Sequence, residues 1–199
     1  MDIIDIIREV VERVSSEVTI RQSDKDGNTI ERVHPFINYI FGSDQYIKDT
    51  LDTWSKSAPK SNKSVGDVVS GEKVKKFPLV ALFVPISEQY GDPAIYCKAN
   101  VSLLIACSSR QEWSNEKRKE TSFENILKPI YERFLAELGK HTFVKEPYSG
   151  CFVHEKLDNY SYGRYGAYTQ SGESVTEPID AIVIRNLKLE ILEKPCNRY

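Results

Sequence analysis

The fold is decided by FPLVALFV at residues 77–84, IYCKANVSLLIAC at 95–107 and FENILKPIYERFLAEL at 123–138. The first is a short continuous apolar run closed by Pro85, which is typical of a buried strand. In the second, every other side chain is apolar, which predicts a long strand with one buried face, and its last few residues are apolar on both faces. The third has apolar residues at helical spacing and predicts an amphipathic helix, with a kink near Leu127–Lys128 caused by Pro129.

Further elements are expected on both sides of this stretch. They are a helix at 3–14, a hairpin of strands at 18–22 and 29–33, a short helix capped by Ser43 or Asp44, and a long strand at 180–192. Strands joined by short connections favour antiparallel pairing. We therefore expect an α/β protein of the α+β type, with a mainly antiparallel sheet and helices packed on it. It should form one domain over residues 1–199, with long loops at 55–76, 108–120 and 145–178.

The composition is that of a globular protein with a mild charge. The chain has 199 residues, 40% of them hydrophobic, and a net charge of −2. A protein that binds nucleic acid by neutralising phosphates usually carries a basic excess, so DNA binding is not expected as the main activity. Asp2 and Asp5 lie where a signal peptide would carry positive charge, and no apolar run approaches the roughly 20 residues that span a bilayer. We expect a soluble protein without a membrane partner.

The four cysteines give no sign of a metal site. Cys97, Cys107, Cys151 and Cys196 are widely spaced, and no two form a CxxC pair. Cys97 and Cys107 lie on the same face of the strand at 95–107, where a thiol behaves as a small buried apolar group. We expect reduced thiols, an intracellular origin, and neither metal nor cofactor.

The sequence contains none of the common catalytic motifs. It lacks the phosphate loop, the dinucleotide fingerprint, the GxSxG elbow and the HExxH zinc motif. His34 precedes a proline, and His141 follows the helix end, where an imidazole can contact terminal carbonyls. His154 and Glu155 are adjacent in an extended segment and should point in opposite directions. No catalytic residue is therefore predicted, and we expect that the protein is not an enzyme.

A tyrosine-rich segment follows the long helix. Tyr and Arg are enriched at protein interfaces because they bury a large area and keep a polar tip. Three interpretations remain open: packing on the same domain, a subunit interface, or stacking on a ligand. The candidate interface residues are Tyr160, Tyr162, Arg164, Tyr165 and Tyr168 in this segment, Lys73, Lys75 and Lys76 in the 55–76 loop, and Trp113 in the 108–120 loop.

Several of these patterns resemble phage and prophage proteins of Bacteroidetes-type hosts. They are KFPLVALF at 76–83, the strand at 95–107, FENILKPIYERF at 123–134, DNYSYG at 158–163 and IDAIVIRNL at 179–187. The resemblance covers most of residues 36–192. The order of elements is also similar to the phage tail-terminator and tail-completion family, in which an N-terminal helix precedes an antiparallel sheet with a helix packed against it.

The resemblance implies a structural virion protein that assembles in the bacterial cytoplasm. Members of that family form homo-oligomeric rings, often hexamers, at the neck or tail, and a dodecamer is a further possibility here. Such a ring acts as tail terminator or head–tail connector and contacts portal, neck or tail proteins, while double-stranded DNA passes through the lumen without sequence readout. The alternatives are a monomeric adaptor that binds one protein, or an enzyme acting on a nucleotide or another small molecule.

Overall fold

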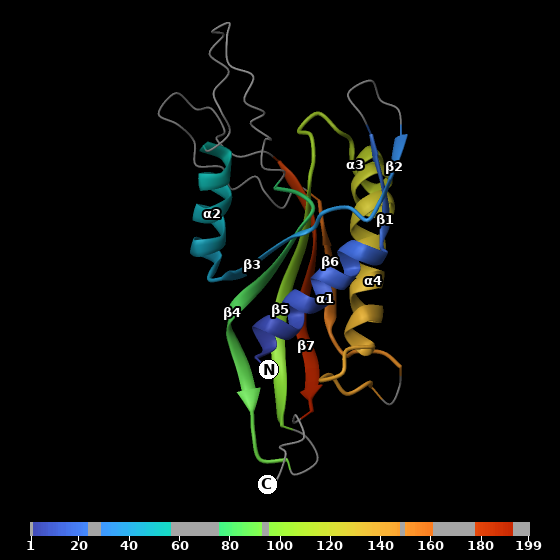
Figure 1. Cartoon of the computed structure of the whole chain (residues 1–199). Helices are drawn as coiled ribbons and strands as arrows, with labels where there is room; N and C mark the ends of the chain where they lie inside the picture. Colours follow the sequence, from blue (N-terminus) through green and yellow to red (C-terminus); the bar gives the residue numbers. More distant parts are fainter. Residues whose placement is uncertain are drawn as a thin grey trace, which may run out of the picture.

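The computed structural model describes residues 2–23, 29–56, 76–92, 96–147, 150–160 and 178–192. The helices are α1 (Ile3–Glu17), α2 (Asp44–Lys56), α3 (Asn115–Arg118), the π-helical segment η1 (Lys119–Leu127) and α4 (Lys128–Gly139). The strands are β1 (Thr19–Ser23), β2 (Thr29–Val33), β3 (Asn38–Gly42), β4 (Leu79–Gln89), β5 (Cys97–Ser108), β6 (Glu155–Asn159) and β7 (Ile179–Ile191). The expected fold class is confirmed: helices pack on a mainly antiparallel sheet (Figure 1).

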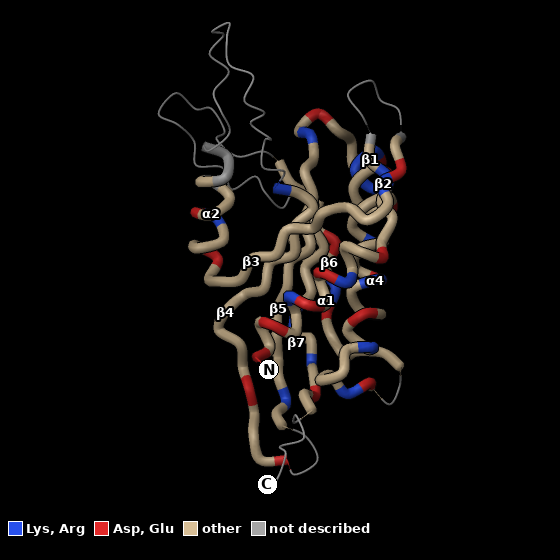
Figure 2. Tube along the Cα trace, in the orientation of Figure 1, with Lys and Arg blue, Asp and Glu red and all other residues tan. Residues whose placement is uncertain are grey.

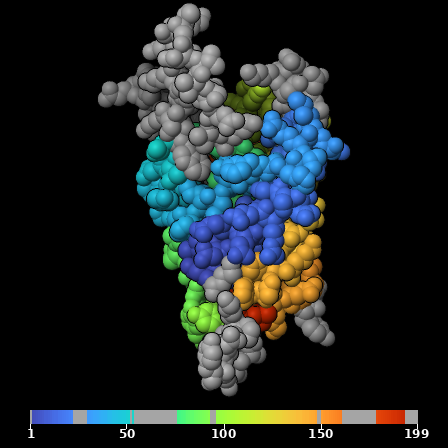
Figure 3. Space-filling view, in the orientation of Figure 1, coloured from blue at the N-terminus to red at the C-terminus, as the bar shows by residue number. Residues whose placement is uncertain are grey.

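The main sheet contains five strands in the order β3-β4-β5-β7-β6, and β1 and β2 form the separate hairpin that the sequence predicts. β3 runs parallel to β4, whereas β4–β5, β5–β7 and β7–β6 are antiparallel. α1, η1 and α4 cover one face of this sheet, and α2 packs on the other. In the space-filling view, α1 crosses the front of the molecule and lies beside α4 (Figure 3).

The central strand β5 is buried as its alternation predicts. Cys97 and Ile105 belong to the larger core, under α1 and α4, whereas Leu104 and Ala106 belong to the smaller core on the opposite face. Ile47 of α2 completes that smaller core. Because helices cover both faces at this end of β5, its last few residues are apolar on both sides, as expected.

The N-terminal helix is fixed by its apolar stripe and its caps. The Asp2 side chain accepts a hydrogen bond from the backbone N–H of Ile4 at 3.4 Å, which satisfies one of the first free donors of α1. Val10 and Val14 are fully buried on the sheet side. The helix ends at Glu17, and the extended backbone of Val18 leads directly into β1. Among the described residues, no helix is both long and apolar enough to cross a membrane.

The expected loop at 108–120 is partly wrong, because its second half is helical. α3 begins at Asn115, and the Ser114 hydroxyl caps it by accepting a hydrogen bond from the Lys117 N–H at 3.2 Å. The charged residues of this segment are typical of a solvated loop. However, Arg118 is buried and paired inside the protein, so the helix begins well before Phe123.

Pro129 lies at the start of α4, where helical winding changes. The last bond of η1 runs from the Lys128 N–H to the Phe123 carbonyl, five residues back. Proline has no N–H, and it is tolerated in the first turn of a helix because an N–H there has no helical partner. The helix changes from π- to α-helical winding between Leu127 and Lys128, the position at which the sequence predicts a kink.

Two further boundaries differ from expectation. β4 continues through Pro85 to Gln89, because its pairing with β5 shifts between Phe83 and Ser87 and so needs no regular ladder bond at the proline. β6 lies within the expected loop at 145–178. Its five residues are mostly polar, and they form a strand by pairing with the distant β7, which local sequence does not reveal.

We predict that Ile105→Ala lowers the free energy of unfolding by about 2–5 kcal/mol, because the substitution leaves a cavity between tightly packed layers. Ile30→Ala is the matched control, since Ile30 is 46% exposed and its substitution should cost far less. Urea unfolding followed by circular dichroism at equal protein concentration measures both. Similar losses for the two variants would contradict the assignment of the core.

Candidate protein-interaction site

A buried ion pair joins α3 to the first residues of β7. The Arg118 guanidinium lies 2.7 Å from the Asp180 carboxylate, and the two side chains are 3% and 0% exposed. Asp180 is paired with Cys107 in the β5–β7 ladder, so the ion pair lies at one end of the central strand β5 and its neighbour β7. Burying such charges is costly unless each is paired and hydrogen-bonded.

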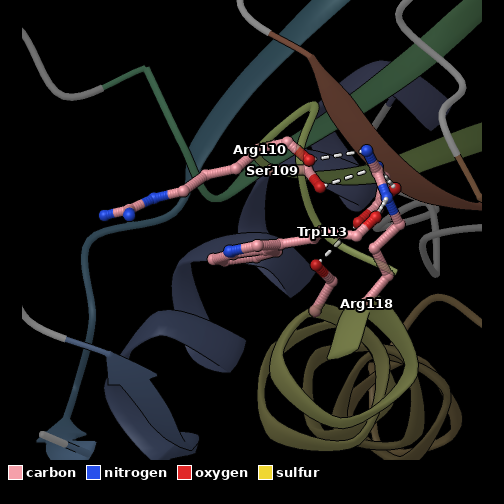
Figure 4. Close-up of polar contacts among 6 residues, drawn as sticks. Ser109, Arg110, Trp113 and Arg118 are labelled. Carbon is pink, nitrogen blue, oxygen red and sulfur yellow. Dashed lines mark hydrogen bonds and ion pairs between the residues drawn. The ribbon is translucent and has the colours of Figure 1, made fainter. Parts of the chain in front are cut away.

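The remaining guanidinium donors of Arg118 bind the loop between β5 and α3 (Figure 4). Arg118 Nε donates to the Trp113 carbonyl at 3.2 Å, and the terminal nitrogens donate to the Ser109 hydroxyl at 2.8 Å and the Arg110 carbonyl at 2.6 Å. The second oxygen of Asp180 accepts a hydrogen bond from the Ser122 hydroxyl at 2.7 Å. The charges are therefore satisfied by the loop, the helix and the strand together.

This network determines which way the loop presents its own side chains. The Arg110 guanidinium lies over the Trp113 ring, 5.7 Å from its centre, and both side chains point away from the ion pair (Figure 4). Arg110 is exposed and Trp113 is half-buried. Arg and Trp are residue types that contribute strongly to protein–protein binding. We refer to residues 109–114 as the anchored loop, and it is the candidate interaction site.

The structure separates the candidate interface residues that the sequence suggested. Trp113 lies in the anchored loop, as described above. The Tyr160 ring lies 4.2 Å from the Phe123 ring and packs on the larger core, so for this residue the structure favours packing on the same domain. Lys76 precedes β4 and is half-buried. The others, namely Tyr162, Arg164, Tyr165, Tyr168, Lys73 and Lys75, lie outside the described residues.

Sequence reasoning missed the residues that build the site. Arg118 stands in a run of charged residues, which is usually a solvated surface. Asp180 directly precedes a run of buried apolar residues, and an acidic group at that position is the one signal that could have suggested a buried partner. Nothing local indicates that Arg118 is this partner, since 62 positions separate the two.

Two histidines connect helices to neighbouring segments. His154 Nδ1 lies 2.8 Å from the Phe152 carbonyl, which can only accept, so this nitrogen donates, and the His154 Nε2 forms a hydrogen bond with the Tyr131 hydroxyl at 2.7 Å. The His141 imidazole does not make the expected contact with a terminal carbonyl of α4, although the His141 backbone N–H donates to the Leu138 carbonyl at 3.2 Å. Its Nε2 lies 3.2 Å from the Glu9 carboxylate of α1, and its Nδ1 accepts from the Phe143 N–H, because α1 crosses the sheet beside the end of α4.

A hollow of about 760 Å³ lies over the opposite end of β5 and β7. Lys98, Asn100 and Lys188 line it from the sheet, and Cys151 and Val153 line it from the segment after α4. Lys98 is paired with Asp92 at 3.3 Å. In the part of the chain that the structure describes, no group of three or more His, Cys, Asp or Glu side chains could hold a metal ion.

We predict that Asp180→Ala lowers the free energy of unfolding by about 3–5 kcal/mol, because it leaves the Arg118 charge buried without its carboxylate. The double variant Arg118→Met/Asp180→Leu replaces both charges with apolar groups and should lose much less stability. Urea unfolding of Arg118→Met, Asp180→Leu and their double variant measures the coupling between the two positions. Additive losses would contradict a direct interaction between the two charges.

We also predict that, in the folded protein, the exposed thiol of Cys151 reacts much faster than the buried thiols of Cys97 and Cys107. Burial raises the pKa of Cys107 to about 12 despite the opposing hydrogen bond from Ser122, and burial also raises the pKa of Cys97. Both thiols therefore stay protonated and covered at about pH 8, whereas Cys151 is exposed. In a Cys196→Ser variant, a colorimetric disulfide reagent should label one thiol in the native protein and three in urea. Rapid native labelling of a second thiol would contradict this burial.

The anchored loop is thus a turn whose inner side binds a buried arginine through backbone carbonyls and whose other side presents the Arg110 guanidinium over the Trp113 ring. Comparison of the chain with protein-family models, curated proteins and solved structures finds no significant match.

Proposed function

We propose that the chain is a structural subunit of a bacteriophage neck or tail, and that copies of it assemble into a ring. The resemblance of its strand and helix patterns to phage proteins supports this proposal. The observation that carries it is the anchored loop, in which a buried ion pair holds the exposed Arg110 and the half-buried Trp113 in place. A buried ion pair often adds little net stability compared with apolar residues of similar size, so its effect here is to define the position of the loop.

A fixed loop is advantageous for binding a protein. Ordering side chains and loops on association costs free energy, and a contact that is already ordered avoids much of that cost. Charges of both signs are interspersed over the described chain instead of forming a basic stripe (Figure 2). This distribution supports a protein partner for the loop over a nucleic acid, and DNA would pass through the ring without sequence readout.

Exposed aromatic side chains elsewhere favour a ring subunit over an adaptor with a single partner. Phe36 is 74% exposed and Tyr46 is 57% exposed near β3 and α2. Tyr90 and Tyr96 form an edge-to-face pair, with ring centres 5.4 Å apart, at the opposite end of the sheet. A ring subunit contacts neighbours through two different surfaces, and subunits at a neck also contact proteins above and below. Portal, neck and tail proteins would be those partners in the virion.

We predict that Trp113→Ala weakens assembly by at least about 30-fold, since truncating a central aromatic contact costs about 2 kcal/mol or more. Trp113→Phe is the matched control, because it keeps an aromatic ring beside Arg110 and should assemble nearly as the unaltered protein does. Light scattering and native mass spectrometry over a concentration series measure the assembly, and circular dichroism checks the fold.

A ring requires a defined multimer that forms as the concentration rises, visible by electron microscopy. A mass that stays monomeric at every concentration, alone and with tail or portal protein added, would contradict the proposed function.

A further inference from the structure

The two edge strands of the main sheet match each other in length. β3 lies at one edge and β6 at the other, and each contains five residues. Among the described residues, no strand pairs with the outer side of either. An unpaired edge presents backbone donors and acceptors that can pair with another strand. The subunit thus carries two edges of equal length on opposite sides of its sheet.

The directions of these strands suit a ring. β3 is parallel to β4, and the three antiparallel pairings that follow make β6 opposite in direction to β3. Rotation about an axis along the strands preserves strand direction from one copy to the next. β6 of one copy would therefore meet β3 of its neighbour in antiparallel orientation, which is the more stable and more common pairing.

The faces also match when the two strands overlap completely. In that register, Leu157 at the centre of β6 lies opposite Ile40 at the centre of β3. Leu157 is paired with Val183, and both Val183 and Ile40 belong to the core on the α2 face, so these side chains point to one side. If the register were shifted by one residue, Leu157 would lie opposite a β3 residue whose side chain points to the other face of the sheet. The complete overlap is thus also the one that continues each face of the sheet into the next copy.

The same register places complementary side chains side by side on the other face. Lys156 lies opposite Phe41, and in the present structure the Lys156 ammonium lies over the Tyr131 ring at 5.4 Å. Phe41 is 40% exposed and stacks on Tyr39. An aliphatic lysine stem covering an exposed phenylalanine ring buries apolar surface and brings a cation near its face. On the α2 face, Leu157, which is 41% exposed, would be covered by the neighbour.

We infer that β6 of one copy pairs with β3 of the next, in the register that joins Lys156 to Phe41 and Leu157 to Ile40. This inference rests on the proposed ring and names the contact that closes it. The contact is head-to-tail, because it joins two different surfaces, and it makes one continuous sheet around the ring.

Cysteine cross-linking tests the register. The background carries Cys151→Ser and Cys196→Ser, so the thiols of Cys97 and Cys107 that remain are buried. Lys156→Cys combined with Phe41→Cys should, on mild oxidation, give a ladder of covalent multimers on a non-reducing gel. Leu157→Cys combined with Phe41→Cys is the matched control, because these two side chains point to opposite faces and should give no ladder.

The possible outcomes separate this inference from the proposed function. A ladder that depends on both cysteines of the Lys156–Phe41 pair supports the contact. A multimer by mass without a ladder overturns the strand pairing and leaves the ring standing, whereas a monomer by mass without a ladder overturns both. Dimers formed by Leu157→Cys alone would show symmetric β6–β6 pairing between two copies and would overturn the head-to-tail contact.

Discussion

The ion pair between Arg118 and Asp180 is the interaction on which the arrangement of α3, the start of β7 and the anchored loop depends. Each charge is fully buried, and together they bind one helix, one strand and the loop of residues 109–114. A buried charge is tolerated when its partners are in place, so these three segments have to adopt their positions together. The beginning of α3 at Asn115, well before the apolar part of the helix, follows from this requirement.

The main sheet lies between two helical layers, and among the described residues no strand pairs with the outer sides of its edge strands. Long apolar strands β5 and β7 lie between α1, η1 and α4 on one face and α2 on the other. The short strands β3 and β6 lie outside this packed centre, with exposed side chains such as Phe41 and Leu157. A rigid centre with surfaces for association at its borders is what a subunit of a closed assembly needs, and neighbours would complete the burial of these side chains.

The sequence predicts the elements whose pattern is local and misses those that depend on distant partners. The alternation in β5 and the helical spacing in α4 arise from burial on one face, and they can be recognised in a short window. β6 has polar residues and forms a strand because β7 lies beside it. The same limit applies to the site: Trp113 is recognisable in the sequence as an aromatic residue in a polar loop, whereas the burial of Arg118 depends on Asp180, 62 positions away. The sequence predicts Tyr160 as a candidate interface residue, but the fold brings its ring against Phe123, a contact between residues far apart in the chain.

Hydrogen exchange of the loop amides in the Arg118→Met/Asp180→Leu double variant tests most directly whether the ion pair positions a binding loop. We expect a folded core with unchanged exchange, much faster exchange at Arg110–Ser114, and weaker assembly at the same protein concentration. Unchanged loop protection together with full assembly would contradict this expectation, because the ion pair would then be dispensable for the position of the Arg110–Trp113 pair.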